Sequence, residues 1–130
     1  MALSRGLADT SIFIAREAER PILEDSLPEE LAVSVITVGE LRAGVLAATD
    51  TPTRDRRLST LEAALALQPV PVDDRVASAW ARLRIVLRDQ GPSMPVNDSW
   101  IAATAMALDV PVVTQDHDFP LVDELDVVHV

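Results

Sequence analysis

Apolar residues along this chain alternate between short runs typical of strands and longer stretches with helical spacing. Strands are predicted at 5–9, 31–35, 68–72, 112–114 and 127–130. Helices are predicted at about 10–14, 37–48, 53–67, 74–90 and 97–108, and the polar segment 17–30 is expected to be partly helical. Short strands that alternate with helices are typical of a parallel sheet covered by helices. The pattern therefore predicts an α/β fold with a short, mainly parallel central sheet.

The longest predicted helix carries its own start and stop signals. Asp73 can cap its N-terminus and Gly91 can end it. Its apolar stripe at helical spacing consists of Val76, Trp80, Leu83 and Leu87. Trp80, like Trp100 on the next helix, could stack on a nucleic-acid base. Both tryptophans also fit core positions, and packing is the interpretation that we favour.

Composition limits the class of protein. With 130 residues, 48% of them hydrophobic, the chain is long enough for one domain (1–130) and too short for two. The absence of cysteine excludes disulfides and thiolate metal sites. No uninterrupted apolar stretch reaches the roughly 18 residues of a membrane-spanning helix, and the segment 1–6 does not have the pattern of a signal peptide. We therefore expect a cytoplasmic protein that does not bind membranes.

The charge distribution restricts how the protein could bind nucleic acid. The net charge is −10, and all 11 basic residues are arginines, eight of them between Arg42 and Arg88. An acidic protein binds nucleic acid poorly without specific contacts, because contacts to phosphate supply most of such affinity. A nucleic-acid substrate would therefore require local arginines, bridging metal ions, or both.

Acidic residues recur where an apolar segment gives way to a helix or loop. They are Asp9, Glu40, Asp98, Asp116 and Asp118. In open α/β sheets ligands bind outside the carboxyl ends of the strands, so residues at these junctions can converge. Converging carboxylates repel one another unless a cation lies among them, and a site made only of oxygen ligands suits Mg²⁺ or Mn²⁺. Such an ion often completes its shell with phosphate oxygens, which points to phosphodiester or phosphomonoester chemistry.

Each acid also has a purely structural interpretation. Asp9 and Asp98 lie where a residue could cap a helix N-terminus. Thr37 and Glu40 have the spacing of a capping box, and the last two acids could form a solvated Asx-turn. These interpretations explain each residue singly, but they do not explain why all the acids fall at such junctions in one small domain.

Four segments carry a resemblance to a known family. They read LADTS (7–11), SVITVGELRAG (34–44), NDSWIAATA (97–105) and VTQDHDF (113–119). Together, in this order and across nearly the whole chain, they resemble the PIN domain, and specifically the toxin ribonucleases of bacterial VapBC toxin–antitoxin pairs. The Thr-x-x-Glu-Leu-x-x-Gly and Asn-Asp-x-x-Ile-Ala-Ala-x-Ala pieces are the most specific.

The resemblance implies a single PIN domain with three α/β/α layers and the activity of a Mg²⁺- or Mn²⁺-dependent endoribonuclease. It also implies inhibition by a cognate VapB-like antitoxin, within a homodimer or a toxin–antitoxin hetero-oligomer. Asp9, Glu40 and Asp98 match the first three acids of the family. Asp116 is the first choice for the fourth because it follows the strand sooner than Asp118. The expected metal ligands are Asp9, Asp98 and Asp116, and Glu40 would orient or deprotonate the attacking water.

Three hydroxyl residues beside these acids are expected to orient the carboxylates, namely Thr10, Ser11 and Thr114. Two other functions compete with the ribonuclease. A phosphatase of the haloacid-dehalogenase type would need a second aspartate two residues after Asp9, where Ser11 stands, and a lysine, which the chain lacks. A PIN-like module without activity, which only binds a partner, is the other alternative.

Overall fold

Four strands form a parallel sheet at the centre of the fold. In the computed structural model, which describes residues 4–130, they are β1 (Arg5–Ala8), β2 (Glu30–Ala32), β3 (Val112–Thr114) and β4 (Val127–His129). The order in the sheet is β2-β1-β3-β4, and each neighbouring pair is parallel. Residues 1–3 of the predicted domain lie outside the described range. The parallel sheet confirms the predicted α/β class.

The connections of the sheet change direction at β1. This strand pairs with β2 on one side, where Gly6 lies opposite Leu31, and with β3 on the other, where Leu7 lies opposite Val112. The carboxyl ends of β1 and β3 therefore lie side by side at a topological switch point. Ligands of open α/β sheets bind in the crevice at such a point.

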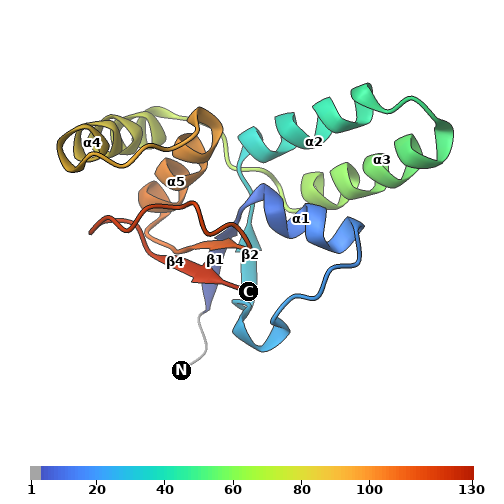
Figure 1. Ribbon diagram of the computed structural model, residues 1–130, viewed down its shortest axis with the longest axis horizontal. Helices are drawn as coiled ribbons and strands as arrows, with labels where there is room; N and C mark the ends of the chain where they lie inside the picture. The colour runs from blue at the N-terminus through green and yellow to red at the C-terminus, as the bar shows by residue number, and fades with distance from the viewer. Residues whose placement is uncertain (1–3) are drawn as a thin grey trace.

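Five α-helices cover the sheet within residues 4–130. They are α1 (Thr10–Glu17), α2 (Val35–Ala47), α3 (Thr51–Leu65), α4 (Asp74–Gln90) and α5 (Val96–Leu108), and a short 3₁₀ turn spans Glu24–Ser26. In Figure 1, α2 and α3 extend to one side of the sheet, and α4 packs with α5 on the other. Because α5 leads into the parallel strand β3, its N-terminus lies toward the carboxyl ends of the strands. In the described part of the chain, no helix combines the length and apolar character needed to cross a membrane.

Successive residues of the central strands point to opposite faces of the sheet. Leu7 and Val112 belong to the core that α4 and α5 cover. Ala8 and Val113 belong to the core formed with α1, α2 and α3. Burial of each large aliphatic side chain stabilises the fold by roughly 1.5–3 kcal/mol. Helices therefore cover both faces, which confirms the predicted three-layer α/β/α arrangement (Figure 1).

Two predictions about local structure are wrong. The segment 68–72 is not a strand, because only Val70 forms a bridge, with Ser34. The structural interpretation of Asp98 as the cap of α5 is also not confirmed. The helix begins one residue before Asn97, and its N-cap is Pro95, which provides no side-chain hydrogen bond.

Candidate functional site

Hydroxyl groups hold Asp9 at the end of β1. Its Oδ2 accepts a hydrogen bond from Thr114 Oγ1 at 2.8 Å and a longer one from the Ser11 backbone N–H at 3.4 Å. The single hydroxyl proton of Thr114 goes to Asp9, so Ser11 Oγ must donate to Thr114 Oγ1, 3.1 Å away. Asp9 is the N-cap residue of α1 and is only 3% exposed. The capping interpretation is therefore correct, but the same carboxylate also accepts a hydrogen bond from Thr114 of β3.

Thr114 also fixes the loop that follows β3. Its hydroxyl oxygen accepts the Asp116 backbone N–H at 2.8 Å, while the Gln115 N–H donates to Ser11 Oγ at 3.0 Å. The Asp116 Oδ1 accepts the Asp118 N–H at 2.8 Å, which is the expected Asx-turn. Asp116 is half-buried, whereas Asp118 is exposed. Of the two acids, Asp116 is thus the less exposed one, and its backbone is held directly by Thr114.

Glu40 points back to the start of α1. Thr10 Oγ1 donates to Glu40 Oε1 at 2.8 Å, so the hydroxyl of Thr37 must donate to Thr10 across 2.9 Å. The N-cap of α2 is Ser34, whose hydroxyl accepts the Ile36 N–H at 3.0 Å. The predicted capping box is therefore wrong, because Thr37 lies inside the helix and both side chains bind Thr10 instead.

Asp98 lies in the first turn of α5 and is half-buried. Burial, followed by repulsion from other carboxylates, raises its pKa from 3.8 to about 6. The repelling groups, in falling order, are Asp9, Asp116, Glu40 and Asp118. The fold thus brings all five predicted acids, from four separate segments, within electrostatic reach of one position.

Two of the three hydroxyl residues act on carboxylates as expected. Thr10 donates to Glu40, and Thr114 donates to Asp9. The hydroxyl of Ser11 does not donate to a carboxylate but to Thr114 Oγ1, which in turn donates to Asp9. Sequence reasoning did not find the role of Thr37, because its spacing from Glu40 pointed to a local capping box.

The donor set suits a hard divalent cation in its chemistry. All five groups are carboxylates, the ligands that Mg²⁺ and Mn²⁺ prefer, and a cation would relieve the repulsion at Asp98. Within residues 4–130, however, no three Asp, Glu or His side chains are already gathered as an ion-binding group. The carboxylate side chains would therefore have to move closer to one another when an ion binds.

Two hollows meet at Glu40. One, of about 300 Å³, is lined by Thr10, Ile14, Glu17, Glu40, Leu41, Gly44 and Arg57. The other, a shallow hollow of about 530 Å³, extends from α2 to Asn97, the neighbour of Asp98. A bound molecule in either hollow would lie against Glu40.

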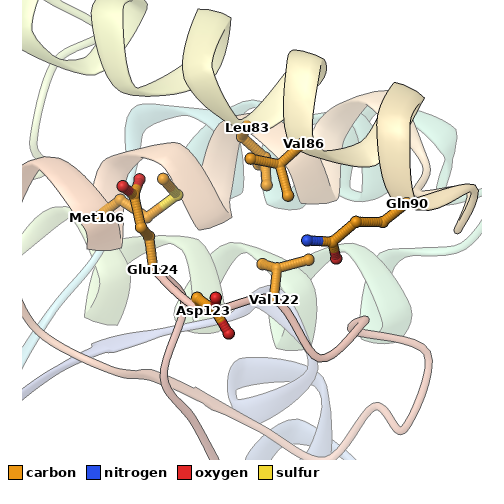
Figure 2. A pocket seen from close by; sticks show the side chains of 7 residues that line it. All are labelled: Leu83, Val86, Gln90, Met106, Val122, Asp123 and Glu124. Carbon is orange, nitrogen blue, oxygen red and sulfur yellow. The ribbon is translucent and has the colours of Figure 1, made fainter.

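A separate pocket of about 150 Å³ lies between α4 and the segment 122–124. Figure 2 shows Leu83 and Val86 pointing from α4 toward Val122, with Met106 at the side. None of the five candidate acids lines it. This pocket is therefore distinct from the candidate site.

Comparisons with known proteins agree with this geometry. The profile of the PIN domain family matches residues 7–125. Ribonuclease VapC5 of Mycobacterium tuberculosis is 48% identical over 118 residues, which are 91% of this chain and 87% of the relative. Ribonuclease VapC4 of the same species is 44% identical over 128 residues, 98% of each chain. The crystal structure of VapBC-5, a member of the VapBC family of toxin–antitoxin systems from M. tuberculosis, matches with a TM-score of 0.89 and 42% identity, covering 98% of this chain and 99% of that chain.

Proposed function

Since this chain belongs to the PIN-domain family, and within it to the VapC proteins, we propose that it is a divalent-metal-dependent endoribonuclease and the toxin of a toxin–antitoxin pair. Its relatives at 44–48% identity are named ribonucleases. The observation that carries the proposal is the placement of the acids at the carboxyl edge of the sheet, where Thr114 joins Asp9 to the Asp116 loop and Thr10 binds Glu40. We also propose that the chain forms a single PIN domain that acts in the cytoplasm, where RNA is abundant.

We assign the binding of Mg²⁺ or Mn²⁺ to Asp9, Asp98 and Asp116, with the exposed Asp118 as the alternative fourth acid. The bound ion would supply a water of lowered pKa and would neutralise charge on the scissile phosphate. Glu40 would take the proton from the water that attacks phosphorus. The hydroxyl of Thr10 fixes Glu40 Oε1, which leaves the other carboxylate oxygen to accept that proton. All five acids are thus assigned to the catalytic site.

The acidic charge of the protein makes the cation part of substrate binding. With a net charge of −10 and five carboxylates at the site, the metal-free pocket would repel RNA phosphates. We therefore expect EDTA to abolish both cleavage and tight binding of RNA.

The test is cleavage of structured RNA by the purified protein with Mn²⁺ or Mg²⁺, compared with EDTA. Asp9→Asn and Asp98→Asn should each lower the rate by about 100-fold or more, because each removes a charged ligand. Asp55→Asn is the matched control, since Asp55 is exposed on α3 and the substitution changes the net charge equally. Cleavage by Asp98→Asn at the wild-type rate would refute the assignment. Turnover of a chromogenic phosphomonoester without RNA cleavage would instead indicate a phosphatase.

We further propose a VapB-like antitoxin as the partner, in a hetero-oligomer. Apolar side chains stand exposed on the three helices of one layer: Ile14 is 38% exposed, Leu58 39% and Leu46 76%. Exposed apolar residues on neighbouring helices are available for a protein interface. A protein coexpressed with its antitoxin should elute as a larger complex with no RNA cleavage. Elution of the same species with and without the antitoxin would refute this partner.

A further inference from the structure

The two tryptophans of the chain stack on each other between α4 and α5. Trp80 of α4 and Trp100 of α5 have ring centroids 4.4 Å apart and planes inclined by 4°. The Arg84 guanidinium lies 5.3 Å from the centroid of the Trp80 ring. Because Trp100 covers one face of Trp80, Arg84 must lie over the opposite face. Trp80 is therefore a packed link between the helices and has no free face for a nucleic-acid base.

A hydrogen-bond chain runs from this stack into the first turn of α5. Trp80 Nε1–H donates to Ser99 Oγ at 3.0 Å, and Ser99 Oγ donates to the Val96 carbonyl at 2.5 Å. Ser99 is 1% exposed. The N-cap residue of this helix, Pro95, gives no side-chain hydrogen bond. These bonds therefore join the first turn of α5 to α4, although they do not replace a cap, because they satisfy none of the free N–H groups of the helix start.

The first turn of α5 carries both the candidate ligand and the residue that is bonded to α4. Asp98 lies in that turn, and its neighbour Ser99 accepts the hydrogen bond from Trp80. A turn that is hydrogen-bonded to a second helix has less freedom to carry Asp98 away from the other acids of the site. We propose that Trp80 is a positioning residue that, through Ser99, holds Asp98 at the site. The proposal rests on the proposed function only in treating Asp98 as a metal ligand.

Two variants separate the hydrogen bond from the packing. Trp80→Phe keeps an aromatic ring in the stack and removes the indole N–H, and Ser99→Ala removes the shared hydroxyl. Each should weaken Mn²⁺ binding about tenfold and lower kcat about tenfold, the usual cost of losing a group that orients a ligand. At saturating Mn²⁺ the KM for RNA should stay unchanged. The double variant should be no worse than Ser99→Ala alone, because Trp80 acts through Ser99.

Val76→Ala is the matched control. Val76 is 2% exposed on α4 and packs in the same interface with α5, against Ala79 and Ala103. Its truncation should lower stability to urea while leaving Mn²⁺ affinity and kcat unchanged at temperatures where the variant is folded. Equal losses in Val76→Ala and Trp80→Phe would overturn the proposal, since the effect would then be general destabilisation. Additive losses in the double variant would overturn it as well.

A measurement that needs neither metal nor RNA keeps this proposal separate from the proposed function. Amide hydrogen exchange at Ser99 and Trp100, followed by NMR without divalent ions, should be about tenfold faster in Trp80→Phe and Ser99→Ala than in the wild type. Unchanged exchange in both variants would overturn the role of Trp80 even if the wild type cleaves RNA. A wild type that neither binds Mn²⁺ nor cleaves RNA would overturn the proposed function, and the exchange rates would still decide whether Trp80 holds the turn.

Discussion

Replacing Asp98 by asparagine should stabilise the metal-free protein, and the gain should depend on pH. The folded protein raises the pKa of this carboxyl from 3.8 to about 6. Between these two values the folded state binds more protons than the unfolded chain, so stability falls as the pH rises through this range. The full cost of the charge is present above about pH 6 and absent below 3.8. Asparagine carries no charge at any of these pH values.

The size of the gain follows from the pKa shift. The difference between a pKa of 3.8 and one of about 6 corresponds to about 3 kcal/mol. Solvent screens a half-buried carboxyl, so we expect Asp98→Asn to raise the free energy of unfolding by about 1–2 kcal/mol at pH 8 and by almost nothing at pH 4. The assay is urea unfolding in EDTA at both pH values, followed by tryptophan fluorescence.

The control is Asp55→Asn, which makes the same charge change on an exposed part of α3. A gain from Asp55→Asn at pH 8 as large as that from Asp98→Asn would show that the lower net charge, and not the surroundings of Asp98, is responsible. An equal gain from Asp98→Asn at both pH values would contradict the argument, because burial and repulsion would then not disfavour the charged form of Asp98. At pH 8 with saturating Mn²⁺, the wild type should instead have a higher free energy of unfolding than Asp98→Asn, because the ion stabilises the wild type more than the variant.

Three further substitutions test the surroundings of the site. Thr114→Val removes the hydroxyl that donates to Asp9, and we expect a loss of about 1–3 kcal/mol in urea unfolding together with reduced RNA cleavage. Thr10→Val removes the donor to Glu40, so kcat should fall about tenfold with little change in KM, as steady-state kinetics would show. Gly6→Ala would place a Cβ 2.7 and 2.8 Å from two neighbouring side chains and should cost about 1–3 kcal/mol in thermal or urea unfolding without a specific effect on kcat. Unchanged stability in the first and third variants, or unchanged kcat in the second, would contradict these contacts.

The layers of the fold could be predicted from the sequence because they depend on local periodicity. Strand runs such as 112–114 and the helical stripe of α4 show directly which residues are buried. The placement of the acids at one edge of the sheet could also be predicted, because parallel strands end at the same edge. The predicted strand at 68–72 failed because Pro69 and Pro71 flank Val70 and have no backbone N–H to donate. The pairing is therefore limited to one bridge, between Val70 and Ser34.

Contacts between distant segments could not be predicted. The capping-box spacing of Thr37 and Glu40 is a local signal, but Thr10, 27 and 30 residues away, binds both side chains. The hydrogen bond from Trp80 to Ser99 likewise joins two helices whose relative rotation is set by packing. No pattern within either segment contains that information.

Diffraction from crystals soaked in Mn²⁺, recorded near the manganese absorption edge, tests the central claim most directly. An anomalous peak within about 2.1–2.3 Å of carboxylate oxygens of Asp9 and Asp98, with Asp116 beside it, is the result that we predict. The absence of any peak at saturating Mn²⁺, or a peak elsewhere on the molecule, would contradict the claim that these distant acids form one cation site.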